Sequence, residues 1–330
     1  MPSKILITGA TGFIGGYLVK SLLARHDNLV CLVRNRNVRA LGQAGVKTVT
    51  GDITNRESLR QAMTGVDAVF HLAALYQIGV RDKARMHQIN VVGTRNVCEI
   101  ARELGVPRLI YCSTVAALGN TGNTIADENF PHDGKFQSEY CRTKYLAHQE
   151  AKALIEKGAP IIIVMPSVVY GPGDPSALAE SWQRYLKGKM PFCVAPETRY
   201  TYVHVEDVVA GMISAYERGR VGESYILAGQ VISNREMLNI LARLTGRPMP
   251  QRTLPFALLK VAAIFDELFS AWQRKTPLVS REAIRMMENC HWAASAAKAQ
   301  QELDWQPRPL DVGLRETFAA FLPQNVYASV

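Results

Sequence analysis

Tyr140 and Lys144 are the residues of this chain whose types and spacing most clearly suggest chemistry. They stand four positions apart, which places both side chains on one face of a helix. An ammonium group beside a phenol favours the phenolate and lowers a pKa that starts near ~10. The pair is therefore a candidate acid and base for proton transfer, although Tyr and Lys also occur at this spacing on ordinary helix surfaces.

A glycine-rich loop near the N-terminus makes a catalytic role for this pair more plausible, because it is typical of nucleotide-binding proteins. Its sequence is Thr8-Gly9-Ala10-Thr11-Gly12-Phe13-Ile14-Gly15. The loop separates a short apolar run from an amphipathic helical stretch, the setting of a dinucleotide-binding turn. Glycines allow backbone N–H groups to approach a diphosphate, and the helix N-terminus adds a favourable partial charge. We expect Gly9, Thr11, Gly12, Phe13, Ile14 and Gly15 to bind a cofactor.

The end of the second predicted strand bears on which dinucleotide binds. A carboxylate there would accept a hydrogen bond from the ribose 2′-hydroxyl, whereas an Arg would accommodate a 2′-phosphate. The strand runs into Arg34, with Arg36 or Arg39 as second clamps, and neither Asp nor Glu is present. The sequence predicts NADP(H) in preference to NAD(H); the alternative is that these arginines only solvate a loop.

The first half of the chain alternates apolar runs with helical patterns. Strands are expected at residues 4–8, 29–33, 46–50, 68–72, 109–112 and 161–164, and helices at 13–25, 56–63, 83–104 and 138–157. Runs that are apolar on both faces suit buried parallel strands. The pattern predicts an α/β protein with a doubly wound parallel sheet, a Rossmann fold, and a smaller, mostly helical C-terminal substrate lobe.

The domain limits are expected where the regular alternation of strands and helices ends. Residues 1–170 should form the dinucleotide-binding domain, with returning segments near residues 203–228. Residues 171–202 and 229–330 should form the substrate-binding lobe. Proline and glycine become frequent after Pro166, as expected for a boundary between two such regions.

Composition and charge exclude several classes of protein. The net charge is +9, but Lys and Arg are scattered, which indicates general attraction for anionic ligands and no nucleic acid partner. Six cysteines form no C-x-x-C pair, so we expect a reducing, cytoplasmic compartment and no metal site. We expect neither a signal peptide nor a transmembrane segment. The apolar stretch 254–272 is interrupted by charges and is interpreted as a partly buried helix, in preference to a membrane-surface helix.

Several further motifs complete a family pattern. They are Asp52-Ile53, His71-Leu72-Ala73-Ala74, Asn90-Val91-Val92-Gly93-Thr94, Cys112-Ser113-Thr114 and, in the second lobe, Tyr202-Val203-His204-Val205-Glu206-Asp207. With the glycine loop and the Tyr-Lys pair, the chain resembles the extended short-chain dehydrogenase/reductases. The end of the second strand looks like that of the dihydroflavonol reductase-like branch, and the second lobe is similar to bacterial proteins named hopanoid-associated sugar epimerases.

The resemblance implies roles for particular residues. Thr114, 26 positions before Tyr140, would bond the substrate oxygen and complete a catalytic set of Thr114, Tyr140 and Lys144. Asn90 would support the active-site helix. The cofactor-binding set would further include Asp52, Ile53, Leu72, Ala73, Ala74, Pro166, Ser167 and Val168, together with Tyr140 and Lys144.

The reaction itself has to be argued from other positions. Val115-Ala116 stand where sugar dehydratases of this family carry an acid pair, so a dehydratase is disfavoured. Tyr200 stands where nucleotide-sugar epimerases usually carry an Arg, with Arg199 one position away. A carbonyl reductase or alcohol dehydrogenase is favoured, a sugar or nucleotide-sugar epimerase is the alternative, and a non-catalytic NADP-sensing protein is an alternative of another class.

The substrate and the assembly are also expectations. The expected pocket wall would suit a lipophilic or aromatic small molecule, unless several of its aromatics belong to the core. It contains Ile78, Phe192 and the four candidate substrate residues Tyr76, Phe136, Trp182 and Tyr200. The resemblance implies a homodimer through the helices near residues 83–104 and 138–157. Met86, Val97, Tyr145 and Leu146 are candidates for that surface, or they face the sheet.

Overall fold

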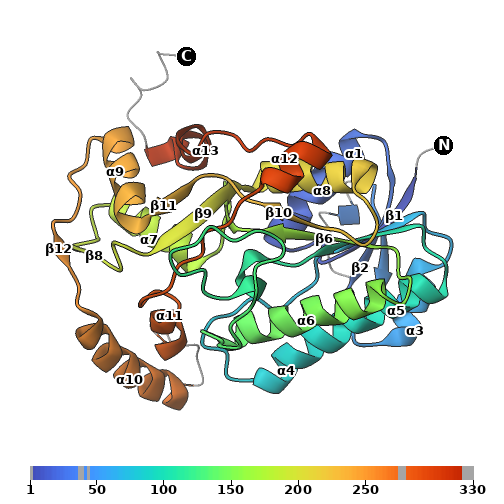
Figure 1. Cartoon of the computed structure of the whole chain (residues 1–330), viewed down its shortest axis with the longest axis horizontal. Helices are drawn as coiled ribbons and strands as arrows, with labels where there is room; N and C mark the ends of the chain where they lie inside the picture. The colour runs from blue at the N-terminus through green and yellow to red at the C-terminus, as the bar shows by residue number, and fades with distance from the viewer. Residues whose placement is uncertain (1–2, 36–40, 43–44, 274–279, 322–330) are drawn as a thin grey trace.

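The main sheet of the computed structural model, which describes residues 3–35, 41–42, 45–273 and 280–321, has seven parallel strands. Their order is β10-β6-β5-β4-β1-β2-β3 (Figure 1). The strands are β1 (Lys4–Thr8), β2 (Asn28–Val33), β3 (Lys47–Thr50), β4 (Ala68–His71), β5 (Arg108–Cys112), β6 (Ile161–Pro166) and β10 (Ser224–Leu227). All six predicted strands are present, and the doubly wound parallel sheet is confirmed.

Helices cover both faces of this sheet, which is why its inner strands are apolar, whereas the edge strand β3 is polar and mostly exposed. One face carries α1 (Phe13–Ala24), α8 (Val205–Arg218) and α12 (Ala297–Leu303), and the other carries α3 (Arg56–Met63), α5 (Thr94–Glu103) and α6 (Glu139–Ile155) (Figure 1). Every residue of β6 is buried. The largest hydrophobic cluster of the protein lies between these layers.

The predicted helix at residues 83–104 is present but changes its winding in the middle. It consists of α4 (Lys83–His87), a π-helical segment η1 (Gln88–Gly93) and then α5. A π-helical turn inside an α-helix is rare and is often found at functional sites. Met86 and Val97 on this helix are fully buried within the protomer, so they pack inward and supply no dimer surface, whereas Tyr145 and Leu146 on α6 are half-buried.

The second lobe is built around a three-stranded sheet in the order β11-β9-β7. Its strands are β7 (Val168–Tyr170), β9 (Arg199–His204) and β11 (Val231–Ser233), and β8 (Phe192–Cys193) pairs with β12 (Arg252–Thr253). Its helices are α7 (Ala177–Leu186), α9 (Asn234–Thr245), α10 (Phe256–Trp272), α11 (Arg281–Arg285) and α13 (Leu310–Thr317). Two short 3-10 turns, η2 (Val115–Leu118) and η3 (Ala319–Phe321), complete the described elements. In that part of the chain, every helix is too short or too polar to cross a membrane.

The returning segments divide between the two sheets. Residues 224–227 pair with β6 and extend the main sheet as β10, as expected. The strand that ends at His204 instead joins the small sheet as β9, beside β7. The chain then continues directly into α8 on the main sheet, so the two lobes share a strand-to-helix junction.

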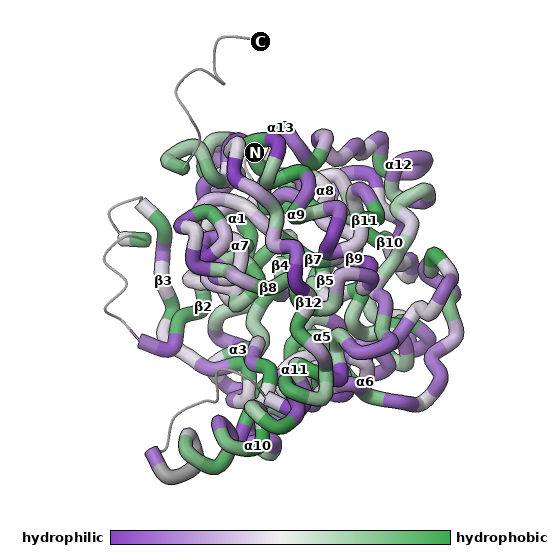
Figure 2. The backbone as a smooth tube through the Cα atoms, turned by 90° about the vertical axis from the view of Figure 1, so that its left-hand side faces the viewer, coloured by the Kyte–Doolittle hydropathy of each residue, from purple (hydrophilic) through white to green (hydrophobic). Residues whose placement is uncertain are grey.

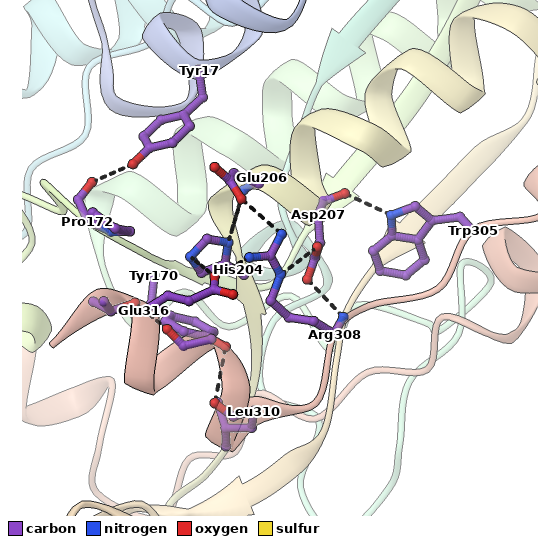
Figure 3. A network of polar contacts seen from close by, with 12 residues as sticks. Tyr17, Tyr170, Pro172, His204, Glu206, Asp207, Trp305, Arg308, Leu310 and Glu316 are labelled. Carbon is purple, nitrogen blue, oxygen red and sulfur yellow. Dashed lines mark hydrogen bonds and ion pairs between the residues drawn. The ribbon is translucent and has the colours of Figure 1, made fainter. Parts of the chain in front are cut away.

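A polar network fixes the C-terminal segment at this junction (Figure 3). The carboxylate of Asp207, at the start of α8, accepts hydrogen bonds from the backbone N–H and from Nε of Arg308, both at 2.9 Å. The guanidinium of Arg308 also pairs with Glu206 and Glu316, and Trp305 donates its indole N–H to the Asp207 carbonyl at 2.8 Å. Because Asp207 is mostly buried, loss of its carboxylate would leave Arg308 without its best-placed acceptor.

We expect Asp207→Ala to lower the free energy of unfolding by about 2–3 kcal/mol, because it removes two charge-assisted bonds at a largely buried position. Urea denaturation would measure the change. Glu180→Ala is the matched control: it removes an exposed ion pair with Arg184, one turn along α7, and should cost less than about 0.5 kcal/mol. Equal losses in the two variants would show that the junction network does not stabilise the fold.

Candidate active site

The glycine loop joins β1 to α1 and packs tightly against the end of β4. Gly9 has a φ of +80°, and a Cβ atom at this position would lie 2.6 Å from the backbone nitrogen of Ala73. A Cβ atom at Gly15 would lie 2.1 Å from the Gly9 carbonyl oxygen. Gly12 caps α1 without a side chain, so the first N–H groups of the helix are available to an anion. The geometry fits a diphosphate cradle.

The next two strands end beside this loop. Arg34 directly follows β2 and is exposed, as a residue that meets a phosphate group must be. Asp52 follows β3, and its carboxylate accepts hydrogen bonds from the backbone N–H and the hydroxyl of Thr54, at 2.9 and 2.8 Å. Ile53 is buried against Gly93, where a Cβ atom would lie 2.6 Å from its Cδ1. Arg36 and Arg39 lie outside the described residues.

Tyr140 and Lys144 lie in the first two turns of α6, which Ser138 caps by accepting a hydrogen bond from the Cys141 N–H at 3.2 Å. The Lys144 ammonium is 3% exposed. It donates to the Cys112 carbonyl oxygen at 3.0 Å and to the Tyr111 hydroxyl at 3.5 Å. The predicted helical pair is therefore present, with its lysine anchored on the end of β5.

The pKa directions in this site differ from the expectation. Burial lowers the pKa of Lys144 to about 8, and burial raises the pKa of Tyr140 well above its ordinary value, with the Tyr76 phenol adding to the increase. The predicted lowering of the pKa of Tyr140 by Lys144 is wrong for this structure: that pKa is raised, and burial is the largest cause. The phenol of Tyr140 is neutral and holds a proton at neutral pH.

Thr114 and Ser113 follow β5 and have different surroundings. Thr114 caps the 3-10 turn η2, and its hydroxyl oxygen accepts a hydrogen bond from the Ala116 N–H at 3.2 Å. Ser113 is buried, and its hydroxyl lies 3.1 Å from Nδ1 of His148 on α6. Ser113 is thus engaged in the interior, which leaves Thr114 as the hydroxyl residue at the surface of the site, beside the N-terminal half of α6.

Asn90 connects the loop after β4 with α6. Its side-chain oxygen accepts from the Leu75 N–H at 2.7 Å, and its amide donates to the Leu75 carbonyl and the Thr143 hydroxyl, each at 3.1 Å. The Thr143 hydroxyl in turn donates to the Tyr140 carbonyl at 3.1 Å. The π-helical segment directs Asn90 into this position. The network gives a physical basis for the supporting role that the family resemblance implies.

The residues after β6 carry an unpartnered polar atom. Ser167 donates its backbone N–H to the Leu227 carbonyl at 3.0 Å, but its hydroxyl is buried and has no hydrogen-bond partner among the residues that the structure describes. Buried hydroxyl groups are normally hydrogen-bonded, so this oxygen is suited to a ligand. Pro166, Ser167 and Val168 were expected to line the nicotinamide, and Leu72, Ala73 and Ala74 lie on the neighbouring side of the glycine loop. These residues fit a nicotinamide cofactor.

Two of the four predicted substrate residues lie at Tyr140. The Tyr76 ring is 61% exposed and meets the Tyr140 ring edge to face, with centroids 4.9 Å apart. Tyr200 on β9 is half-buried against Cys141, and its phenol is close enough to that of Tyr76 to influence its pKa. We call Tyr76 and Tyr140, whose rings are in contact, together with the nearby Tyr200, the tyrosine wall.

The other two predicted substrate residues lie elsewhere. Trp182 is 3% exposed and packs against Tyr170, Tyr202 and Phe318 in the core of the second lobe. Phe136 packs with His132 and Tyr145, beside α6. Trp182 serves the core, which corrects its assignment to the pocket wall. The periodicity of α7 could have signalled this, because Trp182 lies on the same face as two other buried residues, Ala179 and Leu186.

Some residues of the site were not expected from the sequence. Tyr111 holds the Lys144 ammonium over its ring, 5.1 Å from the centroid. Glu282 on α11 accepts hydrogen bonds from the Gly79 N–H at 2.9 Å and the Glu139 N–H at 3.3 Å. Loops separate these residues from the motifs, so spacing in the sequence carried no signal for them.

The buried ammonium predicts a pH dependence of stability. With a pKa of about 8 in the folded state and ~10.4 in the unfolded chain, Lys144 binds fewer protons in the folded state between these values. The stability of the wild type should therefore rise with pH in that window relative to Lys144→Met, which cannot titrate. Urea denaturation of both proteins over a series of pH values measures the difference; parallel curves would contradict the assignment.

Comparisons with known proteins agree with this geometry. A Synechocystis sp. protein provisionally named dihydroflavonol 4-reductase is 35% identical over 92% of this chain and 90% of its own. Sterol demethylase protein B of Methylococcus capsulatus is 29% identical over 96% of this chain and 97% of its own. The crystal structure of gox2253 covers 97% of this chain and 98% of its own, with 35% identity and a TM-score of 0.81.

The match at the level of the family covers more than half of the chain. The NAD dependent epimerase/dehydratase family matches residues 5–228, from β1 through the end of β10. The matched region contains the glycine loop, the Tyr-Lys pair and the strand ends that surround them. The chain belongs to the NAD dependent epimerase/dehydratase family.

Proposed function

We propose that the chain is an NADP(H)-dependent oxidoreductase that reduces a carbonyl group of a lipophilic or aromatic small molecule, or oxidises the corresponding alcohol, through Thr114, Tyr140 and Lys144. The observation that carries the proposal is the geometry of α6, which places the Tyr140 ring against Tyr76 and anchors the buried Lys144, one turn further on, at the end of β5. A phenol in this position is a suitable proton donor to a carbonyl oxygen. When bound, the nicotinamide supplies or accepts the hydride.

Each catalytic residue has one task in this mechanism. Tyr140 passes its proton to the substrate oxygen, and Thr114 donates a hydrogen bond to the same oxygen and holds it in place. Lys144, an ammonium with a pKa of about 8, carries a proton near neutral pH and stabilises the Tyr140 phenolate after transfer. The phenolate takes up a proton from water before the next turnover. In the oxidative direction the Tyr140 phenolate accepts the proton of the alcohol.

The substrate class is inferred from the tyrosine wall and from the relatives. Tyr76 and Tyr200 present rings and single hydroxyl groups beside Tyr140, which suits an apolar or aromatic molecule better than a bare sugar. The two relatives carry the names of a flavonoid reductase and of a sterol-modifying protein. Both names denote work on largely apolar ring systems, which supports the proposal.

A sugar or nucleotide-sugar epimerase is the second candidate, since the family includes epimerases. The geometry at β9 disfavours the epimerase. The Arg199 guanidinium donates to the Gly122 carbonyl oxygen at 3.3 Å, while Tyr200 points to the opposite face and toward Tyr76. Arg199 therefore does not take the place of an Arg that would hold a sugar diphosphate beside Tyr140.

We expect Tyr140→Phe to reduce NADPH-dependent turnover by about 100-fold or more, because it removes the proton donor and leaves the cofactor contacts. NADPH oxidation with a panel of aromatic and alicyclic ketones and aldehydes measures turnover, and fluorescence titration measures cofactor binding, which should change by less than about threefold. Tyr145→Phe, on the same helix, is the matched control and should retain activity.

The same assay separates the alternatives. Conversion of a UDP-sugar without net NADPH oxidation would replace the reductase with the epimerase. Tight NADPH binding with turnover of no compound in either panel would favour a non-catalytic sensor. Unchanged turnover in Tyr140→Phe would refute the role given to Tyr140.

Arg34 provides a separate test of cofactor choice. We expect Arg34→Ser to weaken NADPH binding by about tenfold or more and to leave NADH binding nearly unchanged, because a charge-assisted bond to the 2′-phosphate is lost. Titration of both dinucleotides gives the ratio. Arg243→Ser, at an exposed position on α9, is the control and should leave the binding of both dinucleotides unchanged. Equal affinities of the wild type for NADPH and NADH would contradict the preference for NADP(H).

A further inference from the structure

Helix α10 carries apolar side chains on both of its faces. Leu259 and Ala263 are buried against Ile284 of α11 and hold the helix on the second lobe. The opposite face carries six large apolar side chains with exposed fractions between 48% and 68%: Leu258, Val261, Ile264, Phe265, Leu268 and Phe269. Among the described residues, one face of α10 is therefore buried and the other is largely exposed.

These side chains form one continuous stripe. At ~100° per residue, the six positions fall within an arc of about 140° along the helix. Lys260 lies at one border of the arc and Asp266 at the other. Six Leu, Ile, Val and Phe side chains exposed to this degree present several hundred Å², which matches or exceeds the largest apolar patch of a typical monomer, ~300–600 Å². A patch of this size indicates a docking surface.

Two segments of the second lobe, one of which leads into α10, are rich in cations, whereas Asp266 and Glu267 lie on α10 beyond them. Residues 181–196 and 237–265 hold seven cations: Arg184, Lys187, Lys189, Arg243, Arg247, Arg252 and Lys260. Two of the seven are in ion pairs, Arg184 with Glu180 and Lys260 with Glu288. The structure brings the two segments together, since β8 pairs with β12 and the Tyr185 hydroxyl donates to the Arg247 carbonyl oxygen at 2.9 Å. We call these seven residues the basic rim. Figure 2 shows β8, β12 and α10 on one side of the molecule, with α10 at its periphery.

We propose that α10 docks into the interfacial region of an anionic lipid membrane, with its axis in the membrane plane and the basic rim over the lipid headgroups. An apolar stripe beside clustered Lys and Arg is the combination that binds such surfaces. A second copy of this chain is a poorer occupant, because a symmetric contact through α10 would bring two basic rims together. At 17 residues, α10 is shorter than the ~20 needed to span a bilayer, which agrees with docking on the surface.

The docked face lies one helix away from the candidate active site. Ile284 of α11 packs under α10, while Glu282, on the same short helix, accepts hydrogen bonds from the Gly79 and Glu139 N–H groups beside the tyrosine wall. An enzyme docked in this way would take a lipophilic substrate from the membrane. This use of the surface depends on the proposed function, whereas docking depends on the surface alone.

Vesicle flotation tests the docking with the full chain. We expect the protein to float with vesicles of phosphatidylcholine and phosphatidylglycerol, and to bind vesicles of phosphatidylcholine alone more weakly. Phe265→Ser combined with Leu268→Ser should lower the partition coefficient by about tenfold or more, since both side chains are about two-thirds exposed and are the largest contributors to the stripe. Neither residue belongs to the catalytic set, so the fold and turnover should be retained.

Two further variants serve as controls. Ile125→Ser combined with Val221→Ser removes apolar side chains that are 53% and 49% exposed elsewhere on the surface, and should leave flotation unchanged. Arg247→Gln and Arg252→Gln should each lower binding to the anionic vesicles by roughly fivefold and should not affect binding to the neutral ones.

Three outcomes would overturn the proposal. The first is that the wild type binds to neither kind of vesicle. The second is that the Phe265/Leu268 variant binds the vesicles as strongly as the wild type. The third is that the wild type binds no vesicles but is a dimer in gel filtration, and that the variant is a monomer. The last result would assign the stripe to a second copy of the chain. Flotation needs no substrate, so failure of the reductase assay would not affect it.

Discussion

The close approach of the glycine loop to the end of β4 is the constraint on which the rest of the site depends. A Cβ atom at Gly9 would overlap the backbone of Ala73, and one at Gly15 would overlap the loop itself. Because the strand order reverses between β1 and β4, the chain leaves these strands in opposite directions and a crevice opens between them. One candidate site residue follows the carboxyl end of each of six neighbouring strands: the candidate cofactor residues Gly9, Arg34, Asp52, Leu72 and Ser167, and the candidate catalytic residue Thr114. A single sheet edge therefore collects residues from the whole first half of the chain.

Burial of Lys144 is a cost that this arrangement has to offset. Lys144 is only 3% exposed, so its ammonium group, between α6 and β5, loses much of its hydration. The Cys112 carbonyl oxygen and the Tyr111 ring compensate part of the loss, and the lowered pKa shows that compensation is incomplete. The same dry environment keeps Tyr140 protonated. A pair that is desolvated in this way is prepared for proton donation, because charge that develops on the phenol would be strongly attracted to the neighbouring ammonium.

Much of the large lobe could be predicted from the sequence, because its strands and turns depend on residues that are close together in the chain. Apolar runs predicted the strands, and a glycine-rich loop between a strand and a helix predicted the nucleotide-binding turn. The π-helical segment could not be predicted, since nothing in residues 88–93 departs from an ordinary helical pattern, and the bonds of Asn90 to Leu75 and Thr143 join segments that are distant in the sequence. The pKa direction of Tyr140 was missed for a related reason: spacing shows that two side chains are neighbours, but not how much water reaches them. Which aromatic residues of the second lobe face the core, as Trp182 does, depends on packing between distant segments.

The register of β9 shows how small a difference separates the two enzymatic hypotheses. Side chains alternate across a strand, so a shift of one residue moves a side chain to the opposite face. Arg199 lies on the face that meets Gly122, and Tyr200 lies on the face that meets the tyrosine wall. With the two residues exchanged, the same backbone would direct a guanidinium toward the reacting groups and favour a diphosphate-bearing substrate. In the sequence as it stands, a phenol occupies that place, and the wall beside Tyr140 offers rings and few charges. The polarity of the surface beside Tyr140 thus depends on which face of β9 the side chain of one residue takes.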